Sequence, residues 1–450
     1  MSYQKSIRSA SAPAPLPDIP CPAAVRALLD LFSAHGEGAY LVGGCVRDVL
    51  MGKTPHDWDV AVTTVPADTE AICASAGLET VPTGIAHGTV TVLVPDADPA
   101  APGGNAAPRI PVECTTCRTE GGYSDGRHPD AVTFTCRLED DLSRRDFTVN
   151  AMAAAIAGAP DADGQFHIID LFGGRRDLAD KVIRCVGDPD TRLREDALRV
   201  LRGVRFSVRL GFEPEPATRA ALARCAPGLA RISRERVRTE LEGILTSPDP
   251  DRGVRLMDEL GITPHVFPAG LSPYSSAVTS SGKLASLPDL RTRLAALLWG
   301  LPRAAQTENL SSLRLPNDVR RAVTEMLSFD CRPFEVSRYF ARDMRREYGP
   351  LAADTLCVLR AVTPAEDKET RRDLGRLISY VRASEKAGDC VTVSDLALNG
   401  EDLRALGVAP GRETGRMLAC LLYDVIESPS VNTKEKLTSF VWRHLIGRIR

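Results

Sequence analysis

The segment of residues 40–60 constrains the chain most, because it combines apolar strand residues, a glycine pair and two closely spaced carboxylates. Its sequence, YLVGGCVRDVLMGKTPHDWDV, predicts a short strand, a glycine turn, one helical turn and a second strand that carries Asp57 and Asp59. Side chains on a strand alternate between its faces, so Asp57 and Asp59 are expected to point the same way. Two adjacent carboxylates repel each other unless a cation lies between them, which favours a divalent ion such as Mg²⁺.

The residues before the two aspartates are suited to a phosphate group. Gly43 and Gly44 allow backbone N–H groups to approach a phosphate at the start of a helical turn, and Arg47 adds a cation. A D-x-D pair alone is more often part of a solvated strand than a metal site. In combination, the glycines, the arginine and the aspartates would serve one ligand, a metal-bound triphosphate.

Length and composition narrow the class of protein. A chain of 450 residues is too long for one hydrophobic core and indicates three or four subdomains. Its 12 cysteines lack the spacing of a disulfide scaffold, which favours free thiols and a cytoplasmic location. No apolar run is long enough to span a bilayer, and residues 1–20 lack the apolar core of a signal peptide. The formal net charge of −3 implies that any RNA-binding surface is local.

Two further strands are predicted after the aspartates. The alternation GTVTVLV at 88–94 predicts a strand that pairs with PVECTTCR at 111–118, with an exposed loop over 96–110. Glu113 would be a third carboxylate near the metal if its face of the strand meets Asp57 and Asp59. A glutamate on an edge strand is equally often only solvated, so both interpretations stay open.

The following segments, up to residue 172, have mixed character. Residues 119–132 are polar and glycine-rich and are not expected to form regular structure. Residues 139–152, EDDLSRRDFTVNAM, begin with acidic side chains and are expected to end in an apolar helix that Arg144, Arg145 and Asp146 open. The sequence FHIIDLF at 166–172 predicts the last strand of this domain.

The segment 188–210, DPDTRLREDALRVLRGVRFSVRL, predicts a helix with an apolar stripe and a polar stripe. The polar stripe could be a solvated face with ion pairs. However, the bases C and A each present an amine donor beside a ring-nitrogen acceptor, whereas U and G present a carbonyl beside a ring N–H. Asp196 could accept from the amine and Arg199 could donate to the ring nitrogen, so this pair would accept C and A. The polar stripe, with a spacing of three residues, consists of Asp196, Arg199, Arg202 and Arg205.

The rest of the chain is predicted to be helical. Residues 272–286 are serine-rich and expected to form a loop. A helix, a glycine turn and a second helix are expected over 398–432. Other amphipathic helices are predicted at 232–245, 294–301, 317–329, 350–362 and 371–386.

Several motifs occur in an order that is similar to a known family. GGCVRD followed by DWD resembles the signature of the DNA-polymerase-beta-type nucleotidyltransferases, in the branch of class II CCA-adding enzymes (tRNA nucleotidyltransferases) and bacterial poly(A) polymerases. RRDFTVNA and EDALR match later motifs of that family. The resemblance covers about residues 40–248 and returns at 398–437, whereas the helical region between them is too generic to match.

The resemblance implies an α+β fold. An N-terminal polymerase-beta-like nucleotidyltransferase head, with a mixed β-sheet and helices, would be followed by an all-α neck, body and tail. The expected divisions are a disordered N-terminal tail (1–22), the catalytic head (23–180), the neck that recognises the base (181–248), the body (249–390) and the tRNA-binding tail (391–450).

The resemblance also implies a function and a set of site residues. The enzyme would add C, C and A to tRNA 3′ ends from CTP and ATP by a two-metal mechanism, without a nucleic-acid template. Its partners would be the acceptor end and elbow of tRNA, with neither a membrane nor DNA involved. Asp57 and Asp59 would bind Mg²⁺, with Glu113 as the possible third carboxylate. The nucleotide would be held by Gly44, Arg47 and Arg145, selected by Asp196 and Arg199, and contacted at its triphosphate by Arg202 and Arg205.

Other activities remain open at this stage. Related chains add only the final A or make poly(A), and an RNA-binding module could be built on an inactive polymerase head. The intact glycine, arginine and aspartate set argues against the inactive module. The segment 118–132, which contains Arg127 and His128, matches a loop that helps the family switch from C to A, and its presence argues against an enzyme that adds only CC.

Overall fold

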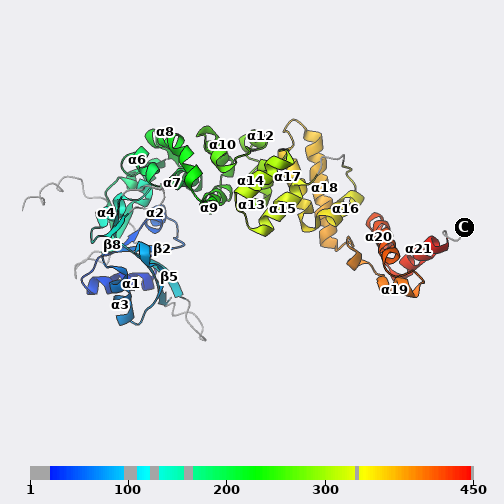
Figure 1. The fold of residues 1–450 in the computed structure, drawn as a ribbon, viewed down its shortest axis with the longest axis horizontal. Coiled ribbons are helices and arrows are strands. Elements are labelled where there is room, and N and C mark those ends of the chain that lie inside the picture. Colours follow the sequence, from blue (N-terminus) through cyan, green and yellow to red (C-terminus); the bar gives the residue numbers. More distant parts are fainter. Residues whose placement is uncertain (1–20, 96–108, 122–130, 157–165, 330–333, 447–450) are drawn as a thin grey trace, which may run out of the picture. The chain divides into compact units, whose positions relative to one another are not determined.

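A mixed β-sheet near the N-terminus is followed by a long series of helices (Figure 1). The computed structural model describes residues 21–95, 109–121, 131–156, 166–329 and 334–446. Contacts divide the chain into two units, Met1–Ser233 and Arg234–Arg450. The α+β class predicted from the sequence is therefore confirmed, and the finer division into head, neck, body and tail stays a prediction.

The sheet of the first unit has seven strands in the order β3-β4-β5-β2-β1-β8-β9. Only β2 and β5 are parallel neighbours, and the other neighbouring pairs are antiparallel. The predicted pairing of the strands at 88–94 and 111–118 is confirmed as the antiparallel pair β4–β5. The strands are β1 (Ala39–Val42), β2 (Trp58–Val62), β3 (Glu79–Gly84), β4 (Thr89–Pro95), β5 (Arg109–Thr116), β8 (Met152–Ile156) and β9 (Phe166–Asp170).

The two faces of the sheet bury different side chains, because strand residues alternate between faces. Val60 and Val62 of β2 pack in one cluster with helices α1 (Ala23–Ala34) and α3 (Pro66–Ser75). Ala61 points to the other face and packs against α4 (Leu138–Ser143). Asp59, two residues before Ala61, therefore belongs to the face that α4 covers.

Two local predictions for residues 119–152 were wrong. Residues at both ends of 119–132 do form regular structure, since β6 (Arg118–Gly121) and β7 (Ala131–Phe134) pair antiparallel. The central part of that segment, with Arg127 and His128, lies outside the described residues, as does most of the 96–110 loop. The apolar end of 139–152 is a 3₁₀ turn and then the start of β8, because Met152 and the alanines Ala153 and Ala154 that follow it are buried in a strand between β1 and β9, where tertiary packing overrides helix propensity.

The rest of the first unit is helical. The predicted helix at 188–210 is broken at Asp196, whose backbone is extended (φ −137°, ψ 106°). The apolar stripe of α7 is buried as predicted, at Leu198, Leu201, Val204 and Val208. The remaining elements are α2 (Gly44–Leu50), η1 (Ile85–His87), η2 (Thr148–Asn150), α5 (Gly174–Asp180), β10 (Val182–Ile183), α6 (Pro189–Glu195), α7 (Leu198–Leu210), β11 (Glu213–Pro214), α8 (Pro216–Cys225) and η3 (Ala226–Arg231).

The second unit contains helices and 3₁₀ turns in its described part. The helices predicted in this region are confirmed, and the serine-rich segment expected to be a loop contains the short helix α12. No helix among the described residues is long and apolar enough to cross a membrane. The elements are α9 (Arg234–Leu245), α10 (Pro250–Glu259), α11 (Thr263–Val266), α12 (Ser275–Ser280), α13 (Leu290–Leu298), α14 (Arg303–Ser312), α15 (Asn317–Leu327), α16 (Arg338–Tyr348), η4 (Gly349–Leu351), α17 (Ala352–Val362), α18 (Lys368–Ala387), η5 (Val393–Asp395), α19 (Gly400–Ala405), α20 (Arg412–Glu427), η6 (Pro429–Val431) and α21 (Lys434–Ile446).

Candidate functional site

Three carboxylates gather where β2 and β5 run side by side. The parallel register places Asp59 directly beside Glu113. Trp58 is buried on the opposite face of β2, as the alternation predicts. Asp57 lies in the bend just before β2, and not on the strand as the sequence suggested. Burial and the charges of Glu113 and Asp57 raise the pKa of Asp59, while Arg145 opposes this rise.

The chemistry of these side chains suits a hard divalent cation. Carboxylate oxygens are the ligands that Mg²⁺ and similar ions prefer, and a cation would relieve the repulsion that Asp59 experiences from its acidic neighbours. Within the part of the chain that the structure describes, no group of three or more His, Cys, Asp or Glu side chains is already arranged around one metal position.

Arg145 is held next to this carboxylate cluster by two local features. The fully buried carboxylate of Asp141 in α4 accepts from Nε and Nη2 of Arg145 at 3.2 and 3.0 Å. Gly43 gives the guanidinium room, because a Cβ at that position would lie 2.7 Å from Nη1 of Arg145. Gly43 also has a φ of +75°, which side-chain-bearing residues rarely adopt. Gly43 is therefore needed for Arg145 as well as for the turn.

A chain of polar contacts links the α2 helix of the head to α7. Arg47, which is buried, donates through Nη1 to Oδ1 of Asn150 at 2.6 Å. Asn150 donates to Oδ1 of Asp146 at 3.2 Å, and Arg202 of α7 donates through Nε to the other oxygen at 2.7 Å. Burial alone would raise the pKa of Asp146, but the charge and hydrogen bonds of Arg202 and the bond from Asn150 outweigh it and lower this pKa to about 2. Asp146 is thus an ionised link between two arginines.

The aromatic ring of Phe206 contacts three of the arginines. The guanidinium carbons of Arg205, Arg202 and Arg47 lie 4.6, 5.3 and 5.5 Å from the centre of its ring. Phe206 itself packs edge-to-face against Phe147, with the ring centres 5.9 Å apart. Such cation–π contacts allow like-charged groups to stay close together. The structure therefore unites the predicted residues Arg47, Arg202 and Arg205 in one basic cluster.

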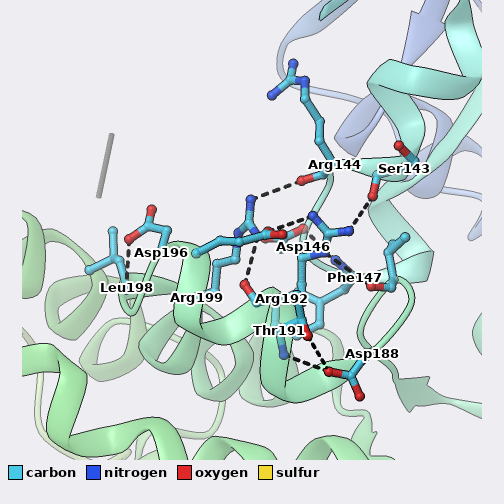
Figure 2. A network of polar contacts seen from close by, with 12 residues as sticks. Ser143, Arg144, Asp146, Phe147, Asp188, Thr191, Arg192, Asp196, Leu198 and Arg199 are labelled. Carbon is cyan, nitrogen blue, oxygen red and sulfur yellow. Dashed lines mark hydrogen bonds and ion pairs between the residues drawn. The ribbon is translucent and has the colours of Figure 1, made fainter. Parts of the chain in front are cut away.

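The predicted base-selecting pair lies at the break between α6 and α7 (Figure 2). Asp196 is not on a continuous helix with Arg199. Its Oδ1 accepts from the backbone N–H of Leu198 at 3.0 Å. Arg199 is buried and donates through Nη1 to Oε2 of Glu195 at 2.5 Å and through Nη2 to the carbonyl of Arg144 at 3.0 Å. Because of the break, the directions of the Asp196 and Arg199 side chains are not tied to each other by the geometry of one helix.

Sequence reasoning missed several residues that hold these groups in place. They are Asp141, Asn150, Arg192, Glu195 and Phe206. An arginine four residues before Phe206 and another directly before it were a usable signal for the aromatic cluster, because i and i+4 side chains meet on a helix. Asn150 lies within the RRDFTVNA motif, but its contact with Arg47, 103 residues away in the sequence, has no local signal.

Comparisons with known proteins agree over nearly the whole chain. Residues 39–184 match the family described as "Poly A polymerase head domain", and residues 211–271 match "Probable RNA and SrmB- binding site of polymerase A". A CCA-adding enzyme of Lactiplantibacillus plantarum is 33% identical over 93% of this chain and 95% of its own length. The CCA-adding enzyme of Lacticaseibacillus paracasei is 35% identical over 91% and 93%. The crystal structure of the Bacillus stearothermophilus CCA-adding enzyme in complex with CTP is 30% identical and superposes with a TM-score of 0.71 over 94% of this chain and 98% of that one.

Proposed function

The chain belongs to the family of CCA-adding enzymes, and from this membership we propose how its residues add C, C and A to the 3′ end of tRNA from CTP and ATP. The observation that supports the assignment of the site is the register of β2 and β5. It places Asp59 beside Glu113, where Arg145 lies close enough to influence the pKa of Asp59. Acidic groups for a metal and basic groups for a triphosphate thus come from one face of the head.

Asp57 and Asp59 are assigned to Mg²⁺, and Glu113 is the candidate for a third carboxylate. When bound, the metal would supply activation of the RNA 3′-hydroxyl and neutralisation of the leaving pyrophosphate. Asp59 contributes a fixed position on the strand, whereas Asp57 lies in the preceding bend. Glu113 is exposed beside Asp59, although β5 lies between β4 and β2 and is not the edge strand that was expected. An exposed position on this face is compatible with either of its interpretations.

The triphosphate is assigned to the basic cluster. Asp141 fixes Arg145 next to the carboxylates. Arg47 lies in α2, directly after the glycine turn, and Gly44 is the first residue of that helix. Arg205 is the arginine nearest to the Phe206 ring centre. Arg202 was expected to face the triphosphate, but its Nε is bound to Asp146. We therefore assign Arg202 to holding the cluster together.

The base is assigned to Asp196 and Arg199. A carboxylate that accepts from an exocyclic amine and a guanidinium that donates to a ring nitrogen are complementary to C and A, and not to U or G. The extended backbone at Asp196 frees its side chain from the helical direction that it would otherwise share with Arg199. This pair would replace a nucleic-acid template.

The partners follow from the same assignment. Recognition of tRNA through shape and phosphates would be tolerant of sequence, which suits an enzyme that acts on many tRNAs. We assign the helical region after residue 233 to the tRNA acceptor arm and elbow. A cytoplasmic location agrees with the eleven described cysteines, all of which are free thiols.

Sequencing of RNA 3′ ends would test the proposal. tRNA transcripts that end before CCA, after C and after CC would be incubated with Mg²⁺, CTP and ATP, with a transcript that already ends in CCA as control. We expect each of the three to be completed to CCA and the control to stay unextended. Addition of A to the CC-ended transcript alone would indicate an A-adding specialist, and an open-ended A tract would indicate a poly(A) polymerase. The absence of any Mg²⁺-dependent addition would favour an inactive RNA-binding module.

A further inference from the structure

Arg199 is the residue assigned to donate to the base, and its guanidinium is already largely engaged by the protein. Nη1 donates to Oε2 of Glu195 at 2.5 Å and to the carbonyl of Arg192 at 2.9 Å, and Nη2 donates to the carbonyl of Arg144 at 3.0 Å. These contacts account for three of the five N–H groups that an arginine carries. Because the guanidinium is planar, they fix the direction of the remaining Nη2 donor.

Arg192 of α6 contacts two of the same regions as Arg199, namely Glu195 and the C-terminal end of α4. Its Nη1 donates to Oε2 of Glu195 at 2.7 Å, so one carboxylate oxygen is shared by Arg192 and Arg199. Its Nη2 donates to the carbonyl of Ser143 at 2.6 Å, the residue before the Arg144 carbonyl that Arg199 binds (Figure 2). Its Nε donates to the carbonyl of Val186 at 3.2 Å. Three donors of Arg192 therefore have fixed partners.

The carbonyls of Ser143 and Arg144 stand at the C-terminal end of α4, where helix carbonyls have no partner within the helix and carry partial negative charge. Two arginines from α6 and α7 thus cap the helix whose residue Asp141 holds Arg145. The contacts connect the segment that selects the base to the segment that holds the nucleotide's phosphates.

We propose that Arg192 is a positioning residue for base selection, which aims the guanidinium of Arg199 by fixing Glu195 and the end of α4. The inference rests on the proposed role of Arg199. Without the Arg192 side chain, Glu195 retains one of its two cations and the end of α4 loses one of its two arginine donors, so the direction of the Arg199 guanidinium is held less firmly. The nucleotide still binds through the basic cluster, but C and A lose their advantage over U and G.

The test compares the incorporation of all four nucleotides by the full-length enzyme on a tRNA transcript without CCA. For Arg192→Gln we expect the ratio of kcat/KM for CTP over UTP to fall roughly tenfold, the size of effect expected from losing a buried hydrogen bond to a charged group. Arg199→Ala should lower the ratio at least as far, and the double variant should be no worse than Arg199→Ala alone, because Arg192 acts through Arg199.

Control variants separate positioning from loss of structure. Arg194→Gln changes the next arginine of α6, whose side chain is 68% exposed and pairs with Asp190, and should leave the ratio unchanged. Arg192→Lys keeps the charge near α4 and should give an intermediate ratio, even if Arg192→Gln does not fold. An equal fall of kcat/KM for all four nucleotides, or additive effects in the double variant, would overturn the inference. If Arg199→Ala leaves the ratio intact, the proposed role of Arg199 itself fails.

Discussion

Phe206 offers the sharpest test of the basic cluster, because it contacts three arginines that reach the site from α2 and α7. Replacement by leucine keeps an apolar side chain in the buried position and removes the aromatic face. A cation–π contact contributes about 0.5–1 kcal/mol, so three of them are worth about 1.5–3 kcal/mol. If half of this is expressed in nucleotide binding, the KM values for CTP and ATP rise roughly 4- to 12-fold.

The assay is single-nucleotide addition to tRNA transcripts that end before CCA and after CC, with CTP or ATP varied. Phe206→Leu should raise both KM values by a similar factor and leave the preference for C and A over U and G unchanged, since the ring is assigned to the arginines and not to the base. Phe32→Leu is the matched control, because Phe32 is also buried, in α1, within the cluster that includes Val60 and Val62 and not Phe206. Unchanged KM values in Phe206→Leu, or an equal rise in the control, would refute this reasoning.

Three further predictions concern individual groups. Asp59→Ala should abolish nucleotide addition while thermal unfolding stays close to that of the wild type, and near-normal turnover would contradict the metal assignment. Arg199→Ala should allow UTP and GTP to be incorporated, which a four-nucleotide assay measures directly. The pKa of Asp146 lies below its ordinary value of 3.8, at about 2, so its contacts stabilise the fold above about pH 4. This stabilisation, about 2 kcal/mol, should be lost as the pH falls from about 4 toward 2. Urea unfolding followed by the fluorescence of Trp58, in a background where Trp299 and Trp442 are replaced by phenylalanine, would show it, and Asp146→Asn should flatten that pH dependence.

Much of the candidate site could be predicted from the sequence because the groups assigned to one ligand come from short motifs. The glycine turn, Arg47 and the two aspartates lie within 20 residues of one another, and strand alternation alone placed Asp59 opposite to the buried Trp58. The position of Glu113 was only a possibility, because it depends on the parallel pairing of β2 with β5. Sequence patterns predict that a strand exists more readily than which strand lies beside it.

Two errors have physical reasons that a single sequence does not reveal. Alanine favours a helix in isolation, yet the alanines of β8 lie in a strand between β1 and β9. Small side chains fit there because both faces of the sheet are covered at this strand. The periodicity of 188–210 continues through Asp196, so it predicted one helix. At the break, the side chain of Asp196 accepts from the backbone N–H of Leu198, the first residue of α7, and such local bonds of aspartate compete with a continuous helix.

The break at Asp196 also explains why the contacts around Arg199 could not be predicted. On one continuous helix, Arg192 and Arg199 would be seven residues apart on the same face, and Glu195 would be a solvated partner between them. The break turns α6 relative to α7, and both arginines then reach consecutive carbonyls at the end of α4 while sharing Glu195. A pattern that looks like surface ion pairing in the sequence becomes a partly buried connection between Arg199, the proposed base-selecting residue, and the end of α4. Under the proposed assignment, the selectivity of this enzyme depends on a helix that is interrupted at Asp196, the residue proposed to read the base.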